Sequence, residues 1–358
     1  MSASGDGVWL AKHRDADTGK RRGYSLGSFG DLLANERFDA ARKAAEEWFG
    51  HMGAGGSGVA VTVKAVCAEY AKSLRSQGRE AAANDALARF QRWVDQDRIG
   101  QVEVQKLNHP KVMEWRRQLA ATQTLPHDKE KKGERLARSD ASLNRDMASF
   151  RAALNFAMRE RLVTTDAAWK VALLPVAGAG NRRQVYLDLK QRNALVDAAA
   201  DDVGQFLKGL CLLPLRPGAL AGLNVGDFDP RLNVLFVGGD KNGKSRHLPL
   251  PKSTAAFLAE QAAGKPADAP LFARAGGMAW KKDSWKKPIK EAVVAAKLPA
   301  DATAYSLRHS TITDLVARHK LDLMTVAILS DTSVAMIEKH YGHLIGDRAM
   351  RALGKLAL

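Results

Sequence analysis

Residues 305–343 read YSLRHSTITDLVARHKLDLMTVAILSDTSVAMIEKHYGH, and the rest of the chain is organised around this stretch. Its apolar residues recur at helical spacing, which predicts a helix with Arg308 near its start and Ser306 as its N-cap. A second short helix is expected over residues 323–329, and a third after the polar residues that follow. The third helix carries Tyr341 near its end. Short turns therefore place an arginine and a tyrosine on neighbouring helices, where both can face one pocket.

An arginine and a tyrosine in one pocket are suited to chemistry on a phosphodiester. A phenol is a poor nucleophile at neutral pH because its pKa is about 10. It becomes effective when cations hold the phosphate and stabilise the charge of the pentavalent transition state. Arginine suits this role, since its planar fork contacts two phosphate oxygens and keeps its charge.

The composition indicates a soluble protein with a polyanionic partner. A length of 358 residues predicts two or three domains, and 46% apolar residues suffice to build their cores. The net charge of +16 favours nucleic acid over a merely solvated cationic surface. Cys67 and Cys211 lie far apart in apolar surroundings, so neither a disulfide framework nor a zinc site is expected. Neither a signal region nor a run of 18 apolar residues occurs, which predicts an intracellular, cytoplasmic protein without membrane contact.

Residues 1–55 predict a small sheet and one helix. Short strands are expected over residues 8–11 and 24–27, separated by a polar, cation-rich turn, and an amphipathic helix over residues 38–49. The glycine-rich residues 50–58 predict a flexible linker.

The middle of the chain, residues 61–163, reads as helical, with apolar and aromatic stripes that indicate packing rather than a cofactor site. The charged run over residues 125–138 predicts a mobile surface loop, either solvated or touching phosphates. Residues 164–184 contain proline, glycine and arginine, which predicts an extended basic linker.

The third unit contains an arginine at a break between two elements. Pro217 excludes Arg216 from helical geometry and starts a new short helix, so the side chain can turn inward. Two strands follow, over residues 232–237 and 246–250, and the Asn242-Gly243 pair between them predicts a hairpin turn. The lysines in this turn are Lys241 and Lys244.

The Tyr-Ser-Leu-Arg-His-Ser stretch, the Leu-Ser-Asp-Thr-Ser stretch and the Lys-His-Tyr-Gly-His ending resemble, in order and spacing, the C-terminal boxes of the tyrosine recombinase (phage integrase) family. The resemblance implies a multidomain, mainly α fold with small β-sheets. An N-terminal arm-type DNA-binding domain of small sheet plus helix would span residues 1–55. A helical core-binding domain would span residues 61–165, and an α+β tyrosine-recombinase catalytic domain residues 183–358.

The resemblance also implies roles for single residues. Tyr341 would attack the scissile phosphate, and Arg308 and Arg216 would bind its non-bridging oxygens. Lys241 aligns best with the family's catalytic lysine, which protonates the leaving 5′-oxygen, and Lys244 is the alternative.

Three positions depart from the family pattern. Tyr305 stands where a histidine is usual, and its hydroxyl can still donate to a phosphate oxygen. Asp331 stands where histidine or tryptophan is usual, and it is either a helix cap or a carboxylate that orients an arginine or Tyr341. Ala219 replaces a glutamate that usually orients the first arginine. His309, His340 and His343 are candidates to share the missing work.

The expected function is site-specific DNA recombination, for integration or excision of a phage or mobile element, through a 3′-phosphotyrosine and without a cofactor. Expected partners are double-stranded DNA, three further copies in a homotetramer, and accessory DNA-bending proteins, in the nucleoid of a bacterial host. The alternatives are a type IB topoisomerase, a catalytically impaired DNA-binding relative, and a metal nuclease built on His340, His343 and Asp331. No glycine-rich phosphate loop is present, so nucleotide hydrolysis is not indicated.

Overall fold

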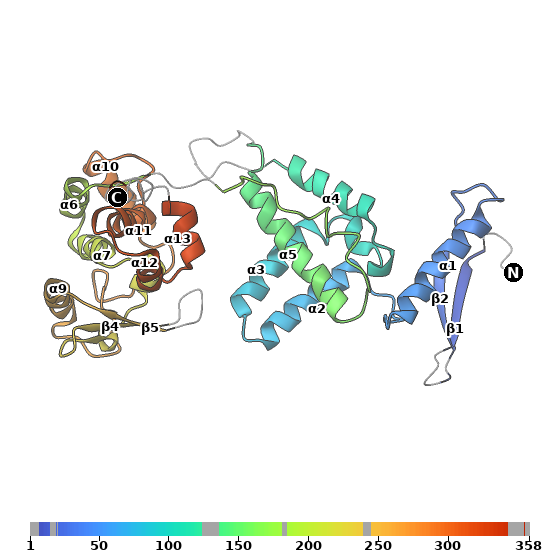
Figure 1. Cartoon of the computed structure of the whole chain (residues 1–358), viewed down its shortest axis with the longest axis horizontal. Coiled ribbons are helices and arrows are strands. Elements are labelled where there is room, and N and C mark those ends of the chain that lie inside the picture. Colours follow the sequence, from blue (N-terminus) through green and yellow to red (C-terminus); the bar gives the residue numbers. More distant parts are fainter. Residues whose placement is uncertain are drawn as a thin grey trace. The chain divides into compact units, whose positions relative to one another are not determined.

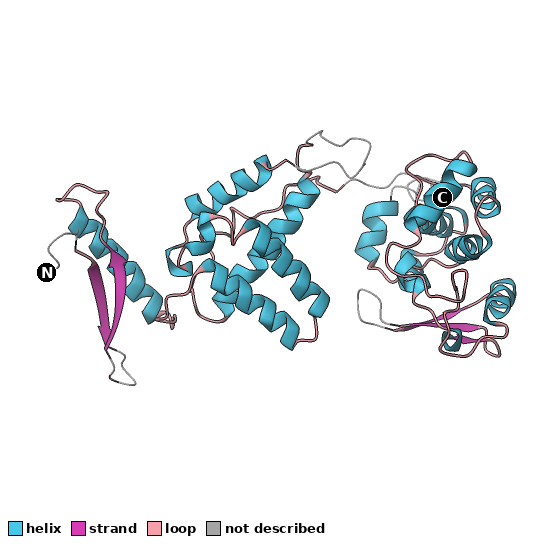
Figure 2. Ribbon diagram, turned by 180° about the vertical axis from the view of Figure 1, so that it is seen from behind, coloured by secondary structure: helices cyan, strands magenta, loops and turns pink. Residues whose placement is uncertain are grey.

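The computed structural model describes residues 7–14, 19, 21–123, 136–180, 185–238, 245–342 and 354. The chain divides into two compact units, residues 1–181 and 182–358 (Figure 1). Helices dominate both units, and the strands form one small antiparallel sheet in each (Figure 2). The expected fold class, mainly helical with small sheets, is confirmed.

The first unit begins with a two-stranded sheet against one helix. Strand β1 (Trp9–Arg14) pairs antiparallel with β2 (Arg21–Gly27), and α1 (Arg37–Gly53) lies beside them (Figure 1). The rings of Tyr24 and Trp48 stack with centroids 5.5 Å apart, which joins sheet to helix. Both strands and the helix were predicted, although the strands run further into the basic segment between them than expected.

The described part of the first unit has four further α-helices. Each has an apolar stripe that faces a shared core. Thr62, Asn108 and Ser139 cap three of them by accepting a hydrogen bond from a backbone N–H of the first turn. The elements are α2 (Val63–Ser76), α3 (Glu80–Trp93), η1 (Arg98–Gln101), η2 (Val104–Lys106), α4 (His109–Ala121) and α5 (Asp140–Arg159).

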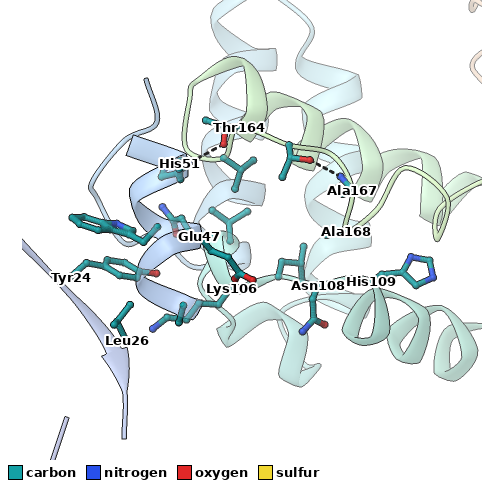
Figure 3. Close-up of a pocket in the computed structure, with 18 of the residues that line it drawn as sticks. Tyr24, Leu26, Glu47, His51, Lys106, Asn108, His109, Thr164, Ala167 and Ala168 are labelled. Atoms are coloured by element: carbon teal, nitrogen blue, oxygen red, sulfur yellow. Dashed lines mark hydrogen bonds between the residues drawn. The ribbon is translucent and has the colours of Figure 1, made fainter. Parts of the chain in front are cut away.

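The glycine-rich segment after α1 is attached to the helical part and is not a free linker. The backbone N–H of Ser57 donates to the carbonyl of Arg161 at 2.6 Å. The ring of His51 contacts the carbonyl of Ser57 at 3.0 Å and the hydroxyl of Thr164 at 3.3 Å, on one side of a cavity of about 750 Å³ (Figure 3). The glycine content predicts a flexible linker, but these contacts hold the segment against the helical part of the first unit.

Two other expected surface segments contribute buried side chains. Trp169 and Leu173 are 1% exposed and pack in the helical core, so the expected extended linker from residue 164 is wrong for this part. Arg138, at the end of the charged run, has a side chain only 4% exposed, paired with Asp146. Residues 125–135 of that run lie outside the described residues.

The second unit combines helices with a three-stranded antiparallel sheet ordered β3-β4-β5, and the sheet lies at one edge of the unit (Figure 1). Its main core gathers fully buried leucine and phenylalanine side chains from the first helices and the sheet, Phe206 and Leu235 among them. The elements are α6 (Leu189–Asp197), α7 (Asp201–Leu212), α8 (Pro217–Ala221), η4 (Val225–Asp227), β3 (Phe228–Asp229), β4 (Val234–Val237), β5 (Arg246–Pro249), α9 (Lys252–Ala262), α10 (Lys286–Ala295), α11 (Ala304–Thr313), η5 (Asp314–Arg318), α12 (Leu323–Ser330) and α13 (Val334–Tyr341).

The three helices predicted from residues 305–343 are α11, α12 and α13, and their existence is confirmed. The predicted N-cap of the first was wrong. Thr303 caps α11 in a reciprocal capping box, in which Ser306 is the third helical residue and its hydroxyl accepts from the backbone N–H of Thr303 at 3.1 Å. After α11 the chain continues as η5, a single π-helical turn.

Candidate active site

Arg216 lies where the sequence predicted, at the break between α7 and α8. Pro217 occupies the first position of α8, and Arg216 is its N-cap with an extended backbone (φ −67°, ψ 144°). This geometry turns the guanidinium toward α12. Nη1 donates to the Asp331 carboxylate at 2.6 Å, and Nη2 donates to the Asp331 carbonyl at 2.7 Å.

Asp331 ends α12 in the left-handed conformation, with φ 49°. Aspartate tolerates this region better than most residues, so the residue both stops the helix and aims its carboxylate. The side chain is 10% exposed and also faces a second arginine, because Arg246 Nη1 lies 3.7 Å from Oδ2. Asp331 is thus the C-cap of α12, and its carboxylate pairs with Arg216, while the N-cap of α13 is Ser333.

Arg308 is buried in α11, and its guanidinium is fixed by backbone oxygens. It donates to the carbonyls of Pro214 and Ser330. Ser330 and Asp331 are adjacent, so two neighbouring carbonyls each hold one of the two predicted arginines. Residues from α8, α11 and the end of α12 thus place two guanidiniums beside a single turn of backbone.

Tyr341 is the last residue of α13 and is 8% exposed. Its hydroxyl oxygen lies 3.0 Å from Nδ1 of His309, and the two rings stack with centroids 5.2 Å apart. Burial raises the pKa of Tyr341 to about 12, while the positive charge of Arg308 acts in the lowering direction. The phenol is therefore protonated at neutral pH, within the field of one of the two arginines.

Two predicted catalytic residues remain, Tyr305 and Lys241, and the structure describes the first of them. Tyr305 lies in the first turn of α11 and is 44% exposed. Lys241, Lys244 and His343 lie outside the described residues. In the part of the chain that the structure describes, no group of three histidine, cysteine or acidic side chains is arranged to hold a metal ion. Nor does any described helix have the length and apolar character needed to cross a membrane.

Asp314 is a buried carboxylate that directly follows α11, the helix that carries Arg308 and His309. Asp314, in the π-helical turn, accepts from the Tyr186 hydroxyl at 2.8 Å and pairs with Arg192 and, at 3.3 Å, with Arg318. These contacts tie α11 to the start of the second unit. A π-helical turn next to a candidate site is a common arrangement.

Two residues of the site were not among the predicted site residues. Arg246 begins β5 and was read only as part of a strand, because no local pattern distinguishes a strand arginine that faces a carboxylate. His309 is one of the three histidines that the sequence offers as candidates to share a role, and its position directly after Arg308 is the available signal.

Comparisons with known proteins show what the chain is similar to in sequence and in fold. Residues 186–346 match the sequence profile of the Phage integrase family. No curated protein sequence matches the chain. Among solved structures, a Tn1549 transposon integrase in complex with a circular intermediate DNA is similar at 17% identity and a TM-score of 0.62, over 81% of this chain and 99% of that one.

Lambda integrase is similar at nearly full length. Its dimer bound to a COC′ core site matches at 15% identity with a TM-score of 0.56, over 93% of this chain and 92% of that one. Its tetramer bound to a Holliday junction matches at 16% identity with the same TM-score, over 90% and 89% of the two chains. At these identities the likeness shows the fold.

Proposed function

Because the chain belongs to the tyrosine recombinase (phage integrase) family, we propose that it is a site-specific DNA recombinase that cleaves and rejoins DNA through a 3′-phosphotyrosine. Its role is integration or excision of a phage or mobile element. Residues 1–55 form an arm-type DNA-binding domain, residues 61–165 a core-binding domain and residues 183–358 the catalytic domain.

One observation carries this proposal. Arg216 and Arg308 come from distant parts of the chain, and they hydrogen-bond to the adjacent carbonyls of Asp331 and Ser330. The charge of Arg308 acts on the hydroxyl of Tyr341. A phosphate bound by two such guanidiniums would lie beside a phenol, which is the arrangement that phosphoryl transfer to tyrosine requires.

The reaction follows from these groups. The Tyr341 oxygen attacks phosphorus and forms a phosphotyrosine, and the bond from phosphorus to the 5′-oxygen breaks. Arg216 and Arg308 bind the non-bridging oxygens and stabilise the charge that gathers on them. Lys241 protonates the departing 5′-oxygen. The phosphotyrosine keeps the energy of the broken bond, so rejoining reverses these steps without a cofactor.

Tyr305 and Asp331 have supporting roles in this account. The Tyr305 hydroxyl donates a hydrogen bond to a phosphate oxygen. Asp331 does not contact the phosphate, since a carboxylate would repel it, and acts by holding Arg216.

The partners follow from charge and from the DNA-bound relatives. A net charge of +16 suits binding to double-stranded DNA. Lambda integrase forms a tetramer on a Holliday junction, and exchange between two duplexes needs several active sites, so we propose a homotetramer on DNA. Accessory DNA-bending proteins assist it, in the cytoplasm of a bacterial host.

The test is covalent capture on nicked suicide duplexes with a randomised region beside the nick. The wild-type chain should form an adduct that survives SDS, and sequencing the captured DNA should give the target site. Tyr341→Phe should bind the selected DNA without forming the adduct. Selected DNA bound by the wild type without an adduct would instead favour the catalytically impaired relative. Relaxation of supercoiled DNA without strand exchange would favour the topoisomerase.

A further inference from the structure

We propose that His309 accepts the hydroxyl proton of Tyr341 during strand cleavage and returns it during rejoining. This inference rests on the proposed function and adds a catalytic residue to it. The histidine touches the reacting oxygen itself, whereas Arg216, Arg308 and Lys241 act on the phosphate and the leaving group.

The geometry brings an acceptor directly to the nucleophile. The Tyr341 oxygen and Nδ1 of His309 are 3.0 Å apart, within hydrogen-bond distance, and the two side chains come from different helices, α13 and α11. The ring stacking at 5.2 Å fixes the imidazole against the phenol. The contact is therefore held by tertiary packing and not by a local turn.

The surroundings of Tyr341 make an acceptor necessary. The residue is 8% exposed, which limits access of bulk water to its hydroxyl. With a pKa of about 12, only about one molecule in ten thousand carries the tyrosinate at pH 8. The nearby guanidinium of Arg308 lowers this pKa but cannot accept a proton, since arginine stays charged. A neutral imidazole can accept it.

The proton balance is complete. As the Tyr341 oxygen bonds to phosphorus, its proton passes to Nδ1 and the imidazole becomes an imidazolium. The leaving 5′-oxygen takes its proton from the separate donor assigned to Lys241. In rejoining, the 5′-oxygen bonds to phosphorus and its hydroxyl proton returns to the donor assigned to Lys241. The bond from phosphorus to the Tyr341 oxygen breaks, and the imidazolium returns its proton to the departing phenolate. His309 must hold its own proton on Nε2 before cleavage, so that the lone pair of Nδ1 accepts from the Tyr341 hydroxyl.

The experiment uses the full chain and the nicked duplex selected by covalent capture. Single-turnover adduct formation is measured from about pH 6 to about pH 9 for wild type and His309→Ala. The wild-type rate should level off above neutral pH. The variant should be slower by about 100-fold near neutral pH, and its rate should rise about tenfold per pH unit, since it depends on the tyrosinate fraction.

Added imidazole provides the second readout, because a small base can occupy the space that the alanine opens. It should raise the rate of His309→Ala by about tenfold or more and leave the wild-type rate unchanged. Rates with and without imidazole come from one preparation, so any loss of folded protein cancels in their ratio. His319→Ala is the matched control, since His319 ends the same helical segment and is exposed.

The outcomes separate this inference from the proposed function. A wild-type rate in His309→Ala would overturn the inference and leave the function intact. A loss that neither imidazole nor alkaline pH restores would also overturn it, because His309 would then act only through packing. If the wild type itself forms no adduct, the proposed function fails and the inference fails with it.

Discussion

Arg216 and Asp331 lie 115 positions apart and are joined by two hydrogen bonds, one from Nη1 to the carboxylate at 2.6 Å and one from Nη2 to the backbone carbonyl at 2.7 Å. The family resemblance implies an orienting glutamate at position 219, where this chain has alanine. The carboxylate that holds Arg216 comes from the end of α12 instead.

Replacing Asp331 with alanine should slow adduct formation by about 10- to 100-fold, because Arg216 loses the group that fixes its direction. DNA affinity should change by less than about threefold, since Asp331 itself is not expected to touch DNA. Both are measured on the selected duplex, by single-turnover rates and by equilibrium binding.

Asp331→Asn is the matched control for that change. Asparagine tolerates the left-handed backbone at φ 49° and keeps an acceptor oxygen, so its rate should lie between those of wild type and alanine. Equal rates in wild type and Asp331→Ala would show that Arg216 keeps its position without the carboxylate.

The lysine assignment can be tested with a leaving group that needs no proton. A substrate with sulfur in place of the 5′-bridging oxygen departs as a thiolate. The Lys241→Ala variant should cleave the ordinary duplex about 100-fold or more slower than wild type. It should cleave the sulfur-containing duplex at nearly the wild-type rate. Lys244→Ala should match wild type on both. The reverse pattern would assign the proton donor to Lys244.

Two glycines of the second unit should respond oppositely to alanine. A Cβ at Gly209 would meet Phe272 at 2.8 Å and Leu220 at 3.1 Å, so Gly209→Ala should lower the free energy of unfolding by about 1–3 kcal/mol. Gly218, in α8, has open space around its Cβ position, and Gly218→Ala should be neutral or stabilising by about 0.5 kcal/mol. Denaturant unfolding measures both, and equal effects would contradict the packing around Gly209.

The pKa of Tyr341, about 12, predicts late ionisation of this phenol. Rapid alkaline jumps, followed by tyrosinate absorbance, should show a difference between wild type and Tyr341→Phe with a midpoint near pH 12. The folded chain holds this proton more tightly than the unfolded chain, whose phenol has a pKa of about 10, so this residue's contribution to stability should fall between about pH 10 and pH 12. A midpoint at or below pH 10 would mean that burial does not govern the hydroxyl.

Local signals in the sequence predicted local geometry well. Pro217 restricts the backbone of Arg216, and the predicted break is present. The helices that carry Arg308 and Tyr341 follow from apolar spacing and polar caps. The N-cap was predicted at Ser306, three residues after the observed cap, Thr303. Both residues of a capping box have hydrogen-bonding side chains, so either can be taken for the cap in the sequence.

Contacts between distant residues could not be read from the sequence. The pairing of Asp331 with Arg216 and Arg246 depends on how α12 packs against α8 and β5, which no local pattern encodes. Glycine-rich residues 50–58 read as flexible because composition reports backbone freedom, while the contact of Ser57 with Arg161 is made across the first unit.

The most direct test of the account is to identify the amino acid that carries DNA after cleavage. The trapped complex is digested with nuclease and protease, and the peptides are sequenced by mass spectrometry. The account predicts a nucleotide remnant on the Tyr341 hydroxyl, linked through the 3′-phosphate, and none in Tyr341→Phe. A remnant on any other residue, or cleaved DNA with a free 3′ end and no attached peptide, would contradict it.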